Sequence, residues 1–269
     1  MIEGLFVVAL LGAVVPAHRL LPGREPRRAE WRAIVGGAVL LAAAMPLTPG
    51  SISGILAIPW LVVVLARAIG RVAGIWKRRA SLAHLADGLV ADAAMAYLAV
   101  GAVWAVISRV GLRPLDFDDR IVLLTAVHFH VAGFVLVVAG EVLRRRHPSP
   151  LTSLALAALV IGIPTTALGF LGVAAAGLIG GWLVSIGGLL IGLGHLRAAA
   201  RGEFRARGLA ATVAGLSLLL TMPLAAAWAT ASTFAFPFVP LPAMAAIHGG
   251  LNVLGFALPV VYAWRGACG

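Results

Sequence analysis

Residues 119 to 144 read DRIVLLTAVHFHVAGFVLVVAGEVLR, a long apolar run with charged residues at both ends. A helix needs about 20 residues to cross the hydrocarbon of a bilayer, so this run predicts a transmembrane helix. His128 and His130 lie in its middle. Because ionisable side chains deep in a bilayer are costly and are commonly functional, this segment is the first place to look for chemistry.

The composition of the whole chain agrees with this prediction. The 269 residues are 61% hydrophobic and 12% charged, whereas soluble domains contain about 25% charged residues. The apolar runs are long and unbroken, which favours helices over the short alternating strands of a membrane barrel. We therefore expect an all-α polytopic membrane protein with a single transmembrane helical domain over residues 1–269.

Apolar runs predict a bundle of about nine transmembrane helices. They cover residues 2–18, 31–47, 52–74, 84–109, 119–144, 150–172, 174–196, 208–232 and 239–264. No basic residues precede the first run, so we interpret it as a retained helix rather than a signal peptide. The boundaries at residues 47–51 and around Gly172 are short, and Pro49 and Gly50 support the first of them as a turn.

The basic residues predict the orientation of this bundle. All but three of the 21 Lys and Arg residues fall at 19–32, 67–79, 144–146, 197–207 and 265, which the predicted helices place on one side. The positive-inside rule then puts the N-terminus outside and the C-terminus in the cytoplasm, which predicts a place in the inner or plasma membrane of a cell. In a membrane protein the net charge of +11 marks topology and contact with anionic lipid headgroups, so we expect no nucleic-acid partner.

The predicted topology divides the seven histidines into those at cytoplasmic helix ends and those within the membrane. A solvated role at cytoplasmic helix ends is expected for His18, His84, His147 and His195. His128 and His248 each lie nine residues after the predicted outer end of a helix, about 13 Å below the outer boundary at 1.5 Å rise per residue, so they could meet.

Two local patterns refine the candidate site. Asn252 lies one turn after His248 and shares its helix face. His128 and His130 are about 200° apart on a regular helix, so one is expected to react or ligate and the other to bond to a neighbouring helix. Which of the two faces His248 stays open.

Other polar residues are expected to be ion pairs or candidates of lower priority. Asp87 and Glu141 lie near basic residues, which predicts ion pairing at the interface. Asp92 lies deeper, where desolvation would favour its protonated form and make it a potential proton donor. Thr221, beside Pro223, and the Thr165–Thr166 pair, after Pro164, could add hydroxyls near the middle of the membrane. The residues expected to contact substrate are Phe129, Phe134, Trp104, Trp182, Trp228, Thr165 and Thr166.

The sequences HFHVAGF (128–134) and HGGLNVLGF (248–256) resemble the YndJ-like family of bacterial integral membrane proteins. The resemblance covers the second half of the chain. It implies that one site contains His128, His130, His248 and Asn252. It does not indicate which reaction this site catalyses.

Three functions remain open. The first is an intramembrane enzyme, a cyclase or isomerase that acts on a terpenoid, polyketide or lipid-like substrate by acid/base chemistry such as cyclisation, isomerisation or epoxide opening. Histidine suits proton transfer near neutral pH, and this chemistry requires no external cofactor and no metal. The second is a haem- or metal-binding protein with histidine ligands. The third is a proton-coupled transporter with a relay of Asp92, Glu141 and the histidines.

Overall fold

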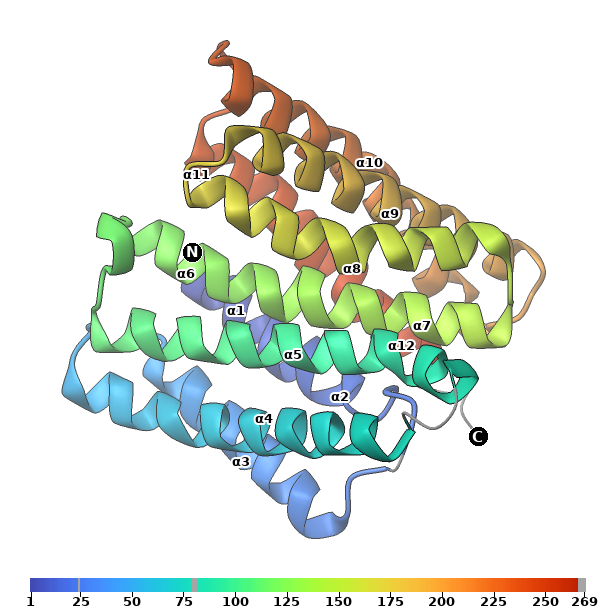
Figure 1. Ribbon diagram of the computed structural model, residues 1–269, viewed down its shortest axis with the longest axis horizontal. Helices are drawn as coiled ribbons and strands as arrows, with labels where there is room; N and C mark the ends of the chain where they lie inside the picture. The colour runs from blue at the N-terminus through green and yellow to red at the C-terminus, as the bar shows by residue number, and fades with distance from the viewer. Residues whose placement is uncertain (24, 79–81, 266–269) are drawn as a thin grey trace. The chain divides into compact units, whose positions relative to one another are not determined.

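The computed structural model describes residues 1–23, 25–78 and 82–265, and within these it leaves the side chains of 76–78 and 82–87 undescribed. The side chains of His84 and Asp87 therefore lie outside the described part, as does Cys268. All regular structure in the described residues is helical (Figure 1). The predicted all-α class is confirmed.

The helices follow the predicted apolar runs closely. The described residues form nine helical segments, several of which combine α-helical and π-helical parts. In chain order the segments are α1 (Ile2–Ala9) with η1 (Leu10–Val14) and α2 (Val15–Ala17); α3 (Arg28–Ala44); α4 (Ser51–Arg78); α5 (Leu82–Val110); α6 (Asp119–His128) with η3 (Phe129–Leu136) and α7 (Val137–Arg146); α8 (Pro150–Phe170); α9 (Ala174–Ala200); α10 (Gly208–Phe234); and α11 (Leu241–Met244) with η5 (Ala245–Gly249), η6 (Leu251–Ala257) and α12 (Leu258–Trp264). Two short 3₁₀ turns, η2 (Pro114–Asp116) and η4 (Arg205–Arg207), lie in the connections.

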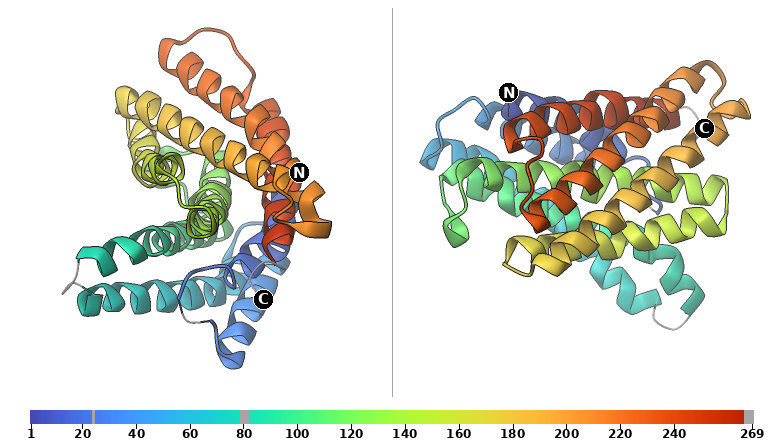
Figure 2. Two further views of the ribbon diagram at one scale, coloured as in Figure 1. Left: turned by 90° about the vertical axis from the view of Figure 1, so that its right-hand side faces the viewer. Right: turned by 90° about the horizontal axis from the view of Figure 1, so that it is seen from above.

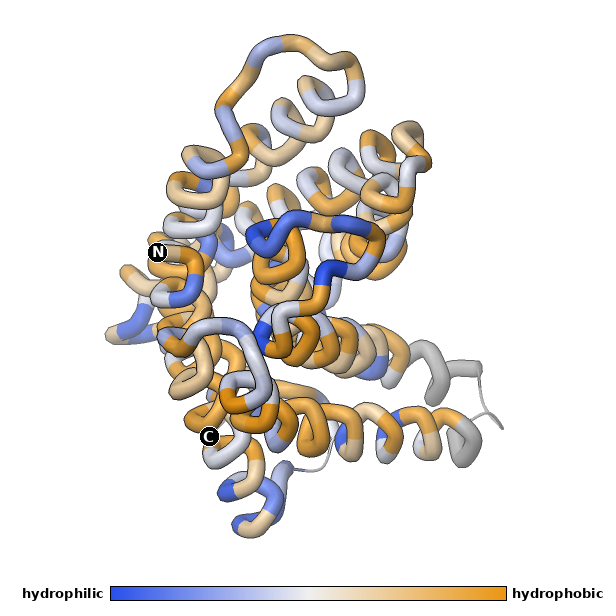
Figure 3. The backbone as a smooth tube through the Cα atoms, turned by 90° about the vertical axis from the view of Figure 1, so that its left-hand side faces the viewer, coloured by the Kyte–Doolittle hydropathy of each residue, from blue (hydrophilic) through white to orange (hydrophobic). Residues whose placement is uncertain are grey.

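Seven of these segments are long and apolar enough to cross a bilayer. The first segment, Ile2–Ala17, is shorter than the usual spanning length, and α3 has 17 residues. Figure 3 shows that the long helices are largely hydrophobic, while strongly hydrophilic positions concentrate at helix ends and in connections. The chain is therefore a multi-pass membrane protein of at least seven candidate spans, and spanning by the first two segments remains a prediction.

Side-chain caps explain where two of the long helices begin. The Asp118 carboxylate accepts a hydrogen bond of 2.7 Å from the backbone N–H of Arg120, at the start of α6. Ser149 Oγ accepts one of 3.1 Å from the backbone N–H of Thr152, and Pro150 occupies the first turn of α8. Both caps satisfy backbone donors that the first turn of a helix leaves without partners.

The chain separates into two compact units, Met1–Val138 (unit 1) and Ala139–Gly269 (unit 2), and each is described by itself. In unit 1, α4 packs against both α3 and α5, and α5 packs against α6 and η3 (Figure 1). Its largest fully buried side chains include Trp60, Phe6 and Phe134.

In unit 2, α8 packs on α9, α9 packs on α10, and α10 packs on η6 and α12. Figure 2 shows α9 and α10 as neighbouring helices joined by a short connection. The glycines of α9 allow this close packing: a Cβ added at Gly187 would lie 2.8 Å from Leu159 Cγ and 2.9 Å from the Ala155 carbonyl oxygen. Small residues at such positions let membrane helices approach, as the sequence predicted.

Candidate functional site

His130 is anchored inside unit 1. Its ring is fully buried, and Trp60 Nε1 of α4 donates a hydrogen bond of 2.9 Å to its Nε2. Its Nδ1 donates to the backbone carbonyl of Ala126 at 2.7 Å. The indole N–H can only donate and the carbonyl can only accept, so this imidazole is neutral and carries its proton on Nδ1. Both ring nitrogens are occupied, and His130 is thus the histidine that bonds to a neighbouring helix.

His128 has the opposite environment. Its side chain is exposed on the surface of the segment and forms no hydrogen bond among the described residues. Of the two histidines in HFHVAGF, His128 is therefore the one whose ring nitrogens remain available for proton transfer or ligation. The expected bond of one histidine to a neighbouring helix is thus made by His130, and a reactive or ligating role of His128 stays a prediction.

Most residues of both motifs lie in π-helical segments, although His128 is the last residue of α6. His130 and Phe134 belong to η3, His248 belongs to η5, and Asn252 belongs to η6. π-Helical turns are rare and are frequent at functional sites. The coincidence favours these segments as functional regions, and it also means that the spacing of a regular α-helix does not apply there.

His248 and Asn252 form a polar cluster with α10 in unit 2. His248 Nδ1 donates to the backbone carbonyl of Thr221 at 3.1 Å. The one proton of the Thr221 hydroxyl is shared between the Ser217 carbonyl, 2.8 Å from Oγ1, and Asn252 Oδ1, 3.1 Å from Oγ1. Asn252 Nδ2 donates to the His248 carbonyl at 2.9 Å. The side chains of Thr221 and Asn252 are buried, and His248 is half-buried. The one-turn relation of His248 and Asn252 is confirmed, and Thr221 joins them.

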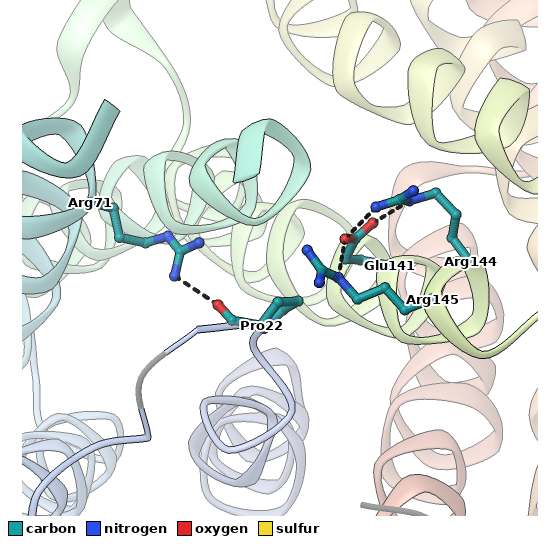
Figure 4. A network of polar contacts seen from close by, with 5 residues as sticks. All are labelled: Pro22, Arg71, Glu141, Arg144 and Arg145. Carbon is teal, nitrogen blue, oxygen red and sulfur yellow. Dashed lines mark hydrogen bonds and ion pairs between the residues drawn. The ribbon is translucent and has the colours of Figure 1, made fainter. Parts of the chain in front are cut away.

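Two of the carboxylates predicted on the helices, Asp92 and Glu141, are held in ion pairs. Asp92 is buried and accepts a hydrogen bond of 2.7 Å from Arg71 Nε. The Nη1 of the same arginine donates to the Pro22 carbonyl at 3.2 Å, as Figure 4 shows. Asp92 is therefore held in an ion pair between α5 and α4, and its role as a proton donor stays a prediction. In unit 2, Arg144 and Arg145 both bind the buried Glu141 carboxylate, at distances between 2.6 and 2.9 Å. The expected ion pairing of Glu141 is confirmed.

The predicted substrate-contact residues of unit 1 lie around the same helices. Phe134 is fully buried, with its ring centroid 5.0 Å from that of His18. Phe129 is half-buried beside Tyr97, and Trp104 stacks on Phe117 at 6.3 Å between centroids. Phe134 is therefore part of the core of unit 1, while Phe129 and Trp104 retain exposed surface.

In unit 2 the predicted substrate-contact residues all form hydrogen bonds within the protein, either to another segment or within their own helix. Trp182 Nε1 donates to Thr230 Oγ1 at 3.1 Å, and Trp228 Nε1 donates to the Val239 carbonyl at 3.2 Å. The hydroxyls of Thr165 and Thr166 donate to carbonyls one turn back in α8. Thr166 also packs closely against Gly180 of α9. A role in substrate contact stays a prediction for these residues.

Two histidines expected in solvated positions are buried instead. His195 is fully buried, and Trp264 Nε1 donates to its Nε2 at 3.0 Å while its Nδ1 donates to the Ile191 carbonyl at 2.9 Å. His18 is 1% exposed and packs against the ring of Trp60. The solvated interpretation is wrong for both, because each helix end is covered by aromatic side chains from other segments. His147 is half-buried and contacts the Glu203 carboxylate.

Sequence reasoning missed the tryptophan partners of the buried histidines. Trp60 and Trp264 donate to His130 and His195, respectively, from positions 70 and 69 residues away in the chain. Similar depth was an available signal in unit 1. Trp60 follows Ser51 by nine residues and His130 follows Asp119 by eleven, and the predicted topology gives both helices the same direction. The predicted meeting of His128 and His130 (unit 1) with His248 and Asn252 (unit 2) stays a prediction.

Long apolar helices with a few anchored polar residues define the class of this protein as a multi-pass α-helical membrane protein. Within that class, the chain belongs to the YndJ-like protein family, whose family model matches residues 5–256. The match covers nearly the whole chain, so the resemblance extends well beyond the second half in which the motifs lie. Comparisons with curated proteins and with solved structures give no match.

Proposed function

We propose that this protein is an intramembrane enzyme that acts on a hydrophobic terpenoid, polyketide or lipid-like substrate by acid/base chemistry. The observation that carries the proposal is the orientation of His248 by the backbone carbonyl of Thr221. A carbonyl can only accept, so Nδ1 of His248 carries the proton and the Nε2 lone pair is the basic position. A histidine held in one tautomer by a backbone carbonyl is suited to act as a general base.

Asn252 supports the same chemistry. Its carboxamide is held by Thr221 and by the His248 carbonyl, which use its oxygen and one of its two N–H donors. The second N–H has no partner among the described residues. A preoriented amide donor in a site of low polarity can bind a substrate oxygen and stabilise charge that develops on it.

His128 is the second candidate for proton transfer. Its ring is exposed and not hydrogen-bonded in the described structure, whereas its neighbour His130 is held by Trp60 and Ala126. We assign His130 to positioning of the π-helical segment and His128 to acid/base chemistry. Isomerisation or cyclisation needs one group that removes a proton and one that returns it, and neutral and protonated imidazoles serve both purposes near neutral pH.

The alternatives have less support from the same contacts. A haem or metal ligated by His130 would require one of its two hydrogen bonds to break, because both nitrogens are used. A transporter with a carboxylate relay would require Asp92 and Glu141 to leave arginine partners that hold them at 2.6 to 2.9 Å.

The proposal is tested by comparing the hydrophobic metabolites of cells that produce the wild-type protein, His248→Gln, or His147→Gln. Mass spectrometry of the extracted isoprenoid, polyketide and lipid fractions should show at least one compound that changes with the wild type. His248→Gln should abolish that change, because glutamine cannot accept and return a proton at this position. The matched control His147→Gln removes a histidine outside the cluster and should leave the change intact.

Two results would contradict the proposal. One is a set of metabolite profiles that does not differ between cells with and without the wild-type protein. The other is a change that His248→Gln preserves while the variant accumulates in the membrane at the wild-type level.

A further inference from the structure

Unit 1 contains a buried arginine that no carboxylate neutralises directly. The Arg109 side chain, near the end of α5, is 4% exposed as a residue, and no carboxylate oxygen among the described residues lies within 4.0 Å of it. Its Nη1 donates to the carbonyls of Met45 and Leu47, and its Nη2 donates to Ser108 Oγ. Its Nε is buried and has no hydrogen-bond partner in the part of the chain that the structure describes. A buried cation without an anionic partner is costly, so its retention calls for an explanation.

Arg109 lines a cavity of about 390 Å³ at the helix ends of unit 1. The cavity lies where α3 and α5 end and where α4 and α6 begin, as its lining residues show. Its polar side chains are Glu3, Thr48, Ser108, Arg109, Asp119 and Arg120. Such a volume accommodates a small polar group at the depth where a lipid headgroup meets the helix ends.

The charges around this cavity leave an excess of positive charge. Asp119 forms a bidentate ion pair with Arg113, whose Nε and Nη2 lie 2.7 and 2.6 Å from its oxygens. Arg113 itself lies outside the spans, and the hydrogen bond to Asp119 raises its pKa. The lining carboxylate besides Asp119 is Glu3, which is half-buried, lies 3.5 Å from the amine of Met1 and interacts electrostatically with Arg109. Arg109 and Arg120 therefore face a single carboxylate that also pairs with the Met1 amine.

We propose that this cavity binds the phosphate group of a ligand, with the buried Arg109 guanidinium as its fixed cation and Arg120 as a second cation at the exposed side. The guanidinium is held by two backbone carbonyls and a hydroxyl, so it is preorganised before the ligand arrives. Arginine binds phosphate oxygens through short, charge-assisted hydrogen bonds. The Thr48 side chain adds a hydroxyl donor to the lining. The proposal does not depend on His248 or on the proposed enzyme activity.

Arg109 also has a structural role that the experiment must separate from binding. Its backbone carbonyl accepts hydrogen bonds from Gly50 N and Ser53 Oγ, and its side chain caps the end of α3. A variant at this position is expected to lose stability for that reason alone. Arg120→Gln is the more informative variant, because the Arg120 side chain is exposed and forms no ion pair in the described residues.

The test measures the unfolding temperature of the purified protein in neutral detergent as a function of two probes, inorganic phosphate and a short-chain phosphatidic acid. Arg120→Gln and Arg109→Lys are compared with the wild type, and the surface variant Arg201→Gln in unit 2 is the charge-matched control. At least one probe should raise the unfolding temperature of the wild type and of Arg201→Gln. Arg120→Gln should bind that probe about tenfold more weakly, and Arg109→Lys more weakly still, because lysine cannot reproduce the guanidinium fork.

The two probes distinguish the source of the phosphate. A response to phosphatidic acid alone identifies a lipid headgroup, and a response to inorganic phosphate as well identifies a site for free phosphate. The proposal is overturned if neither probe stabilises the wild type, or if Arg120→Gln and Arg109→Lys respond with wild-type affinity.

Discussion

At the scale of single residues, the same hydrogen-bonding pattern holds two buried histidines, one in each unit. In both, a tryptophan N–H donates to Nε2 and Nδ1 donates to the carbonyl four residues earlier. A buried imidazole with both nitrogens satisfied avoids the desolvation cost that an unpartnered polar group would incur. These pairs therefore fix helix contacts, which separates His130 and His195 from the histidines proposed for chemistry.

Trp60→Phe should lower the stability of the protein by about 1 to 2 kcal/mol. The variant removes the donor to His130 Nε2 in a site that is fully buried, so the imidazole acceptor loses its partner. The measurement is unfolding in detergent, with Trp182→Phe as the control, because the Trp182 bond to Thr230 is exposed. Equal losses for the two variants would argue against a structural role for the Trp60–His130 bond.

At the scale of elements, the π-helical segments and the glycine-lined face of α9 set the packing. The π-helical turns carry His130, His248 and Asn252, so the positions of these side chains follow from the local widening of the helix. In α9, Gly187 lies against Leu159 and the Ala155 carbonyl of α8. The pair α8–α9 is therefore sensitive to single methyl groups on that face.

Gly187→Ala and Gly36→Ala should change stability in opposite directions, although the chemical change is the same. The new methyl at position 187 meets α8 atoms at 2.8 to 2.9 Å, so it forces a shift that costs about 1 to 3 kcal/mol. Position 36 in α3 has no neighbouring atom within 4 Å, and alanine there should gain up to about 1 kcal/mol from reduced backbone entropy in the unfolded chain.

Unfolding temperatures of the two alanine variants in one detergent provide the measurement. A stabilising Gly187→Ala would show that α8 and α9 do not pack as closely as described.

At the scale of the whole molecule, charge distribution predicts the orientation in the membrane. Residues 144–146 are three consecutive arginines, whereas the segment 113–119 balances its arginine against aspartates. Basic residues near helix ends remain in the cytoplasm, so the two connections should lie on opposite sides of the membrane.

Cysteine labelling tests this orientation in a Cys268→Ser background. A membrane-impermeant maleimide should label Asp116→Cys in intact cells, and it should label Pro148→Cys only after permeabilisation. The reverse pattern would mean that the topology is the inverse of the predicted one. Labelling of both positions in intact cells would mean that the two connections do not lie on opposite sides of the membrane.

The sequence by itself determined the helical class, the approximate bounds of the helical segments and the polar residues worth attention. It could do so because hydrophobic length is a local property and because a bilayer forces backbone hydrogen bonds to be satisfied within each helix. The relation of His248 to Asn252 and the pairing of Glu141 with Arg144 are also local, since the two residues of each pair are four and three positions apart in the chain.

Only the tertiary structure decided which histidine is anchored, which partner holds Asp92 and where a cavity surrounds Arg109. These facts depend on contacts between segments far apart in the chain, such as Trp60 with His130 or Arg71 with Asp92. Periodicity gives the face and depth of a residue, but the rotation of one helix against another follows from side-chain packing along both. The segment HFHVAGF shows this division: its place in a membrane helix is readable from the sequence, whereas the contrast between a bound His130 and an open His128 comes from packing against α4.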